Sequence, residues 1–211
     1  CVAACAPAVD TAQIVARARQ ELHEQEGHAW TQTLALRMLA SPSALRLLHR
    51  LARITQVTGL QGLTRVAGIT GWLGTPGSVA EQVGPVGSRT ASMRARSLPG
   101  PRSEVRGRLG FLMCCYQDIT AAEATEATLR VLSANGYEVV VPSLGCTGLP
   151  AKSLGDRDAL LGMGRSTVER LRGLEVDALV GDSASCTQHV RDYGRQLAPD
   201  RHPQQDFFLA N

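Results

Sequence analysis

After residue 107, apolar runs of strand length alternate with longer segments that have helical periodicity. Residues 137–141 (YEVVV) show this most clearly, because the β-branched run is bounded by Gly136 and Pro142. Strands are expected at 108–114, 137–141 and 176–180, and helices at 120–134, 156–171 and 186–197. Strands that alternate with helices of this length form βαβ units around a parallel sheet. This half of the chain is therefore assigned to the α/β fold class.

The first half of the chain is expected to be helical. Asp10 and Gln13 have the spacing of a capping box, which predicts a helix from Ala12 that ends near Gly27. Further helices are expected at 30–39, 43–57 and, more briefly, within 60–72. Residues 74–107 are rich in Pro, Gly and Arg and lack strong periodicity, so we interpret them as a linker. The proposed division is 1–73, 74–107 and 108–211.

Composition excludes several classes of function. Only 4% of the residues are aromatic and the net charge is +3, which argues against a nucleic-acid partner. No run of about 18 apolar residues is present, so no membrane-spanning helix is expected. No Walker A motif, Rossmann fingerprint or GxSxG elbow is found, so we expect no nucleotide or flavin in this chain. No residue is assigned a catalytic role.

Charge and cysteine usage bear on location. Residues 1–110 hold thirteen Arg against six acidic residues, a balance that suits either a solvated surface or contact with anionic lipid headgroups. The sequence shows no secretory signal, and its thiols suit a reducing compartment. We therefore expect a cytoplasmic protein with a solvated basic surface, and peripheral contact at the inner face of the membrane is the alternative.

Four cysteines follow the three expected strands. Cys114 and Cys115 close the first strand, Cys146 follows the second, and Cys186 follows the third. The carboxyl ends of parallel strands share one edge of the sheet, so these thiols are expected to meet there. Convergent thiolates bind zinc or an iron–sulfur cluster. Zinc sites usually use C-x₂₋₄-C pairs, which this half lacks, but zinc remains a competitor.

Two glycines and a second pair of cysteines add to this pattern. Gly145 and Gly148 flank Cys146 and would allow the main chain to approach a cofactor closely. Cys1 and Cys5 are spaced C-x₃-C with Pro7 close behind, which is weakly similar to the end of a bacterial ferredoxin motif.

The cysteine blocks resemble a known family. Residues 146–150 (CTGLP) followed by Gly155 are similar to the CCGxPxxxxG signature of the cysteine-rich (CCG) domain family. That family includes the glycolate oxidase iron–sulfur subunit and heterodisulfide reductase subunits. Residues 185–194 resemble the next cysteine block of the family, and residues 1–11 resemble the end of a paired ferredoxin module. The implied fold is the α-helical tail of a ferredoxin-like module followed by an incomplete parallel βαβ cysteine-rich domain.

The resemblance also implies site residues and partners. Cys115, Cys146 and Cys186 would be ligands of a 4Fe–4S cluster, and Gln117 matches the family's Cys-x-Gln. Cys1 and Cys5 would bind clusters of the ferredoxin module. The function implied is that of an electron-transfer subunit in a complex that oxidises a 2-hydroxy acid such as glycolate or lactate. An FAD-containing dehydrogenase, as a partner subunit or fused domain, would supply electrons, and a quinone or other acceptor would take them.

The sequence departs from the family at three positions. Thr147 stands where the second Cys of the signature belongs, Ser183 replaces a Cys found in heterodisulfide reductases, and Ala6 replaces a ferredoxin Pro. Cys114 is the candidate replacement ligand, but successive strand residues point to opposite faces, so this requires a bend. A zinc-stabilised or metal-free assembly module therefore remains the alternative. Thiol–disulfide chemistry between Cys114 and Cys115 is a further, less favoured reading.

The histidines are mostly read as surface residues. His189 lies on the helix after Cys186, where it would either tune the cluster or, as favoured here, face solvent. His23, His28 and His49 lie on amphipathic helices and are expected to be exposed.

Overall fold

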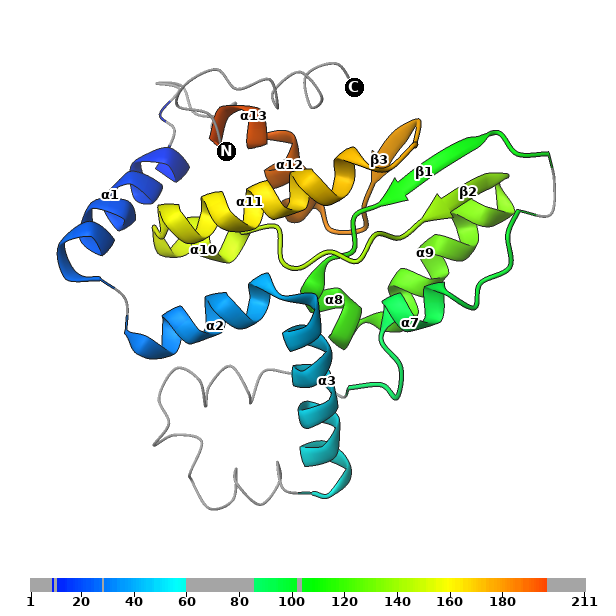
Figure 1. The fold of residues 1–211 in the computed structure, drawn as a ribbon, viewed down its shortest axis with the longest axis horizontal. Helices are drawn as coiled ribbons and strands as arrows, with labels where there is room; N and C mark the ends of the chain where they lie inside the picture. The colour runs from blue at the N-terminus through cyan, green and yellow to red at the C-terminus, as the bar shows by residue number, and fades with distance from the viewer. Residues whose placement is uncertain (1–8, 10, 28, 60–85, 102–103, 197–211) are drawn as a thin grey trace.

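The computed structural model describes residues 9, 11–27, 29–59, 86–101 and 104–196, and Figure 1 shows their arrangement. The N-terminal helices are α1 (Thr11–Glu26), α2 (Trp30–Ala40) and α3 (Pro42–Val57). They are followed by α7 (Ala91–Ala95), β1 (Gly107–Phe111), α8 (Cys115–Thr120), α9 (Ala122–Ala134) and β2 (Tyr137–Val140). The remaining elements are α10 (Leu149–Leu154), α11 (Arg157–Arg172), β3 (Ala178–Val180), α12 (Ala184–Arg191) and α13 (Tyr193–Gln196).

The strands form a parallel sheet with the order β2-β1-β3. Leu109 on the central strand is opposite Val139 on one side and Ala178 on the other. Pairing continues one residue beyond β1, since the Leu112 amide donates to the Val180 carbonyl at 2.7 Å. The expected α/β class with a parallel sheet is confirmed.

Helices cover both faces of the sheet (Figure 1). Phe111 is fully buried against α9 and α7, in a cluster that includes Ala91 and Leu129. The next residue, Leu112, points to the opposite face and packs with Val168 and Leu171 of α11. This alternation follows from the two-residue period of an extended chain. The carboxyl ends of the strands are thereby held between two apolar layers.

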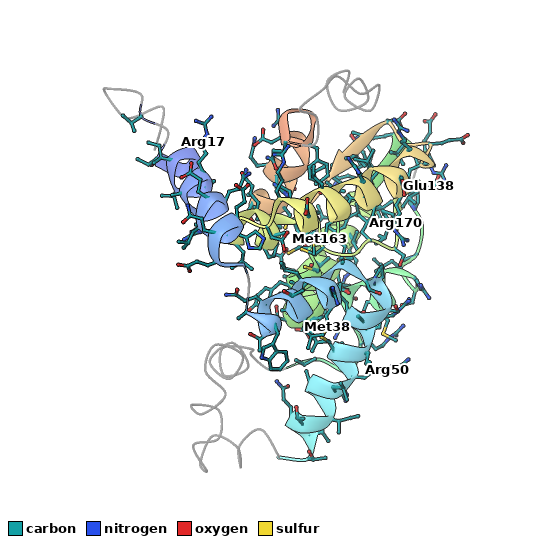
Figure 2. All side chains as sticks on the ribbon, turned by 60° about the vertical axis from the view of Figure 1, so that its left-hand side comes forward. Arg17, Met38, Arg50, Glu138, Met163 and Arg170 are labelled. Carbon is teal, nitrogen blue, oxygen red and sulfur yellow. The ribbon has the colours of Figure 1, made fainter. Side chains whose placement is uncertain are left out.

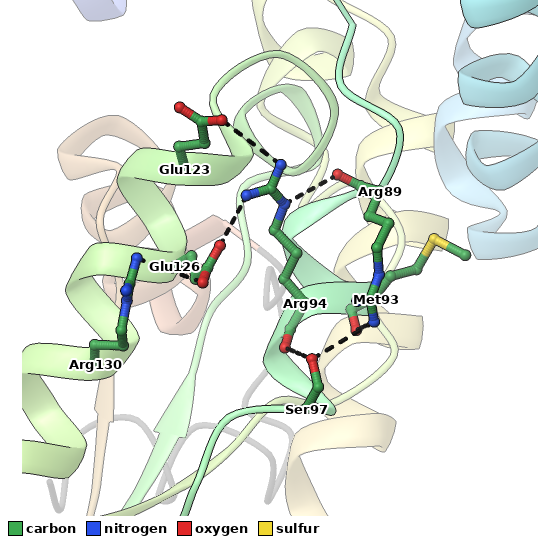
Figure 3. A network of polar contacts seen from close by, with 7 residues as sticks. All are labelled: Arg89, Met93, Arg94, Ser97, Glu123, Glu126 and Arg130. Carbon is green, nitrogen blue, oxygen red and sulfur yellow. Dashed lines mark hydrogen bonds and ion pairs between the residues drawn. The ribbon is translucent and has the colours of Figure 1, made fainter.

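A polar network joins α7 to α9. Helix α7 lies within residues 86–101, which belong to the segment interpreted above as a linker. Arg94 of α7 pairs with Glu126 of α9 at 2.8 Å and with Glu123 at 3.7 Å (Figure 3). Its Nε also donates to the Arg89 carbonyl at 3.4 Å. The hydrogen bond from Arg94 holds the pKa of Glu126 below its usual value, with a further contribution from Arg130. Part of this segment therefore packs on the sheet domain.

The expected helices and strands occur close to their predicted bounds. Gly27 has φ of 71° directly after α1, as its predicted role in ending that helix requires. Asp10, the expected N-cap, lies outside the described residues, as does the short helix expected within 60–72. The short helices α7, α8 and α10 were not predicted, because a helix of about one and a half turns shows too little periodicity to be recognised.

The N-terminal helices pack directly on the loop that carries Cys146. The Cys146 amide donates to the Leu39 carbonyl at the end of α2, at 2.8 Å. A side chain at Gly145 would meet the Ala40 carbonyl oxygen at 2.3 Å, so only glycine allows α2 to approach this closely. In Figure 2, the Met163 side chain of α11 lies on the side of that helix nearest α2, where it packs in a hydrophobic cluster with Leu36. Arg50 lies on the outer surface of α3. The helical half and the sheet half are thus joined at the cysteine loop.

No helix in the described ranges is long and apolar enough to cross a membrane.

Candidate functional site

The four cysteines of the sheet domain come together at the carboxyl end of the strands. Cys114 and Cys186 place their sulfur atoms 3.8 Å apart, although 72 residues separate them. The Cys115 sulfur contacts the sulfurs of Cys114 and Cys146, which completes a continuous group of thiols. All four cysteines are free, and Cys114 and Cys146 are buried. The expected convergence of these thiols is confirmed, and they are referred to below as the thiol group.

A sharp bend lets two successive cysteines join the thiol group. Strand β1 ends at Phe111, and Cys114 is the N-cap of α8 with φ of −71° and ψ of 121°. Cys115 is the first residue of the helix. The alternation of an extended chain therefore no longer applies at Cys114 and Cys115. This strand-to-helix turn supplies the bend that Cys114 needs to act beside Cys115.

Hydrogen bonding splits the pKa values within the thiol group. The Cys115 and Cys186 thiols lower the pKa of Cys114, and Cys115 also lowers the pKa of Cys146. The pKa values of Cys115 and Cys186 are raised, because each shares its proton with the Cys114 sulfur and because burial disfavours the thiolate. Cys114 and Cys146 therefore lose their protons more readily than the other two cysteines. The thiolate is the form that binds metals.

Thr147 lies within the site but differs from its neighbours in chemistry. The residue is 4% exposed, and its side chain lies close enough to the Cys186 thiol to lower the pKa of that thiol. Its carbonyl accepts a short hydrogen bond from the buried Tyr193 hydroxyl on α13. Tyr193 therefore anchors the main chain next to Cys146. Burial raises the pKa of Tyr193, so this hydroxyl keeps its proton.

Removing the Tyr193 hydroxyl is expected to destabilise the loop. Tyr193→Phe leaves the buried Thr147 carbonyl without this partner, which should lower the free energy of unfolding by about 1–2 kcal/mol. Urea unfolding followed by circular dichroism would measure the loss. Tyr116→Phe is the control, because Tyr116 is 59% exposed and its change should stay within about 0.5 kcal/mol. Equal effects of the two substitutions would show that the Tyr193 hydrogen bond adds nothing.

Two predictions about histidines were wrong. His189 is 3% exposed rather than on the surface, because α12 turns this face toward the loop at Thr147 and toward α13. Burial, with the charge of Lys152, lowers the pKa of His189 to about 4, so the ring is neutral. His49 is 5% exposed, because α3 packs this side chain toward Gly87, with which its Nε2 forms a 3.1 Å hydrogen bond. His23 is half-buried, and His28 lies outside the described residues.

The structure also gives the positions of Gly145, Gly148 and Gln117, which were proposed to contact a cofactor. Gly145 is explained by the approach of α2, and Gly148 has φ of 96°, a left-handed conformation that starts α10. Gln117 lies in α8, two residues after Cys115, with a buried Oε1 that has no partner in the described part of the chain. Their role toward a cofactor stays a prediction. Cys1 and Cys5 lie outside the described residues.

Buried side-chain atoms without hydrogen-bond partners gather in the segments that follow the strands. Within the described residues they include Gln117 Oε1, Thr147 Oγ1, Asp182 Oδ1, Thr187 Oγ1 and both ring nitrogens of His189. Of these, the sequence interpretation missed Asp182 and Thr187, since neither belongs to a cysteine motif. Buried polar atoms normally find partners, so these atoms have hydrogen-bonding capacity left for water or for a bound group.

The donor set fits an iron–sulfur cluster better than a single ion. No three His, Cys, Asp or Glu side chains in the described ranges are arranged to hold one metal ion. An iron–sulfur cluster requires a different arrangement of ligands, because its cysteines bind separate iron atoms rather than one common metal ion. Four convergent thiols at the edge of a buried layer meet that requirement.

Comparisons with known proteins agree with this geometry. Residues 27–81 match the family described as "Glycolate oxidase iron-sulfur subunit, linker region", and residues 109–191 match "Cysteine-rich domain". The chain is therefore similar to glycolate oxidase iron–sulfur subunits in its linker region and to the cysteine-rich domain family in its sheet half. The cysteine-rich match runs from β1 to the end of α12 and contains the whole thiol group.

A curated relative supports the same family. Over 116 residues the chain is 25% identical to a "Probable glycolate oxidase iron-sulfur subunit" of Bacillus subtilis (strain 168). The match covers 54% of this chain but 26% of that protein, so the chain spans about a quarter of its relative. No solved structure matches the chain.

Proposed function

We propose that this chain is part of an iron–sulfur electron-transfer subunit of a complex that oxidises a 2-hydroxy acid of the glycolate or lactate type. The convergence of the thiol group carries the proposal, because it brings together cysteines from the ends of three strands. A bound cluster supplies one-electron transfer there. No residue of the chain is assigned a role in substrate chemistry.

Cys114, Cys115, Cys146 and Cys186 are proposed to hold a 4Fe–4S cluster. Cys114 takes the place of the thiol that Thr147 cannot provide, because a neutral hydroxyl is a poor ligand for iron compared with a thiolate. Gln117 of α8, together with Gly145 and Gly148 on either side of Cys146, is proposed to shape the surroundings of the sulfurs. Cys1 and Cys5 are proposed to belong to a neighbouring ferredoxin module.

The family resemblance and the exposed surface of the chain both suggest protein partners. An FAD-containing dehydrogenase subunit or fused domain would deliver electrons, and a quinone or other acceptor would receive them. Helix α3 supports a subunit contact, because Leu47, Leu51 and Ile54 lie one to two turns apart and are each about half exposed. The basic first half supports peripheral contact with an anionic membrane surface.

One distance is compatible with a second candidate function, a zinc-stabilised assembly module, although no third ligand in the described residues completes the set. Zinc binds thiolates at about 2.3 Å in a tetrahedron, which places two sulfurs about 3.8 Å apart. The Cys114 and Cys186 sulfurs are separated by this distance. Metal content distinguishes the two candidates directly.

The experiment is an anaerobic analysis of iron, acid-labile sulfide and zinc, with EPR spectra, on the full-length protein and its Cys146→Ser variant. We expect iron and sulfide in the unmodified protein and the loss of one cluster's signal in the variant. Ser185→Ala is the control, because Ser185 is exposed and adjoins Cys186 without belonging to the thiol group. Zinc in place of iron would favour the assembly module. Iron and EPR spectra that Cys146→Ser leaves unchanged would refute a cluster at this site.

A further inference from the structure

His189 is a buried polar side chain that the proposed ligand set does not use. It is 3% exposed, and neither ring nitrogen makes a close hydrogen bond within the described residues, although the Thr147 main chain lies near enough to the ring to raise its pKa slightly. Leaving such a group unpaired costs about 1–3 kcal/mol. His49, which is also buried, has a partner in the Gly87 carbonyl. His189 therefore has the environment of a residue whose partner is supplied by a bound group.

His189 lies on the same helix as Cys186 and near the loop that carries Cys146. It follows Cys186 by three residues on α12, so both side chains lie on the same face of the helix. Its ring meets the Tyr193 ring edge-on, with centroids 5.2 Å apart and planes at 80°. Tyr193 in turn holds the Thr147 carbonyl, next to Cys146. The imidazole is thus held beside the turns that carry two of the sulfurs.

The thiol group already contains four sulfurs, so the cluster needs no nitrogen ligand from His189. Sulfur atoms of the cluster and its thiolates accept hydrogen bonds, and such bonds set the reduction potential. We propose that His189 donates a hydrogen bond from its ring N–H to a sulfur of the iron–sulfur centre and raises its reduction potential. This inference rests on the proposed function and makes His189 a positioning residue of the centre.

The test uses the full-length protein labelled with ¹⁵N-histidine. Pulsed EPR should detect a weak nitrogen coupling in the signal that Cys146→Ser removes, and His189→Leu should abolish that coupling. Redox titration should show a lower midpoint potential for His189→Leu than for the unmodified protein. His189→Gln should restore most of the potential, because its amide can donate in place of the ring. His49→Gln is the control and should change neither measurement.

Each remaining outcome is decisive. Equal midpoint potentials for the unmodified protein and His189→Leu would overturn the inference. A strong coupling typical of directly bound nitrogen would overturn it in favour of ligation. If His189→Leu fails to fold, the coupling measured in the unmodified protein and in His189→Gln still decides the question. Absence of iron from the unmodified protein would instead overturn the proposed function, and this inference with it.

Discussion

Gly145→Ala is expected to lower the free energy of unfolding by about 3 kcal/mol and to reduce the iron content of the protein. The new Cβ would lie 2.3 Å from the Ala40 carbonyl oxygen and 3.2 Å from that of Leu39. Both are main-chain atoms at the end of α2, so they cannot move aside as a flexible side chain would. The shift also strains the 2.8 Å hydrogen bond from the Cys146 amide to Leu39. Urea unfolding and iron analysis would measure the two effects.

Gly162→Ala is the matched control for this substitution. Gly162 is exposed in the middle of α11, and a side chain there would meet nothing within 4 Å. Alanine in an exposed helix interior should raise the free energy of unfolding by about 0.5–1 kcal/mol. A Gly145→Ala protein as stable as the unmodified one would contradict the close packing of α2 on the cysteine loop.

Leu129→Ala is expected to cost about 3 kcal/mol of unfolding free energy. Leu129 is 1% exposed and packs from α9 against a cluster that includes Phe111 and Met113 of the β1 region. Truncation removes buried apolar surface and leaves a cavity that the parallel sheet cannot easily close. The expected result is a lower urea midpoint at an unchanged slope.

Val131→Ala tests whether that loss comes from burial. Val131 lies on the same helix, two residues later, and is 60% exposed. Its substitution should change the free energy of unfolding by less than about 0.5 kcal/mol. Similar losses for Val131→Ala and Leu129→Ala would mean that α9 does not cover the sheet as described.

The sequence was most informative where local pattern and topology agree. The run at 137–141 identified β2 because β-branched residues lie between a glycine and a proline. Once the strands were expected to be parallel, the meeting of Cys114, Cys146 and Cys186 followed from topology. The family resemblance added a cluster to the possible bound groups, which spacing alone left open.

The sequence was least informative where contacts between distant segments determine whether a residue is buried or must be glycine. His189 has the same local surroundings as many exposed histidines, and only the docking of α12 against the Thr147 loop buries it. Gly145 was assigned to the cofactor because it adjoins Cys146, and its close packing against α2 was not foreseen. Neither fact has a signature within a short window of sequence.

The contact of the N-terminal helices with the cysteine loop also bears on the order in which the protein forms. Arg19 of α1 donates to the Ser153 carbonyl of α10 at 2.9 Å, and these residues are 134 positions apart. During synthesis the helices leave the ribosome long before their binding surface exists. Contacts of such long range are slow to form. The surface of α1 that contacts α10 is therefore without its partner in the nascent chain until the residues around Ser153 have been synthesised.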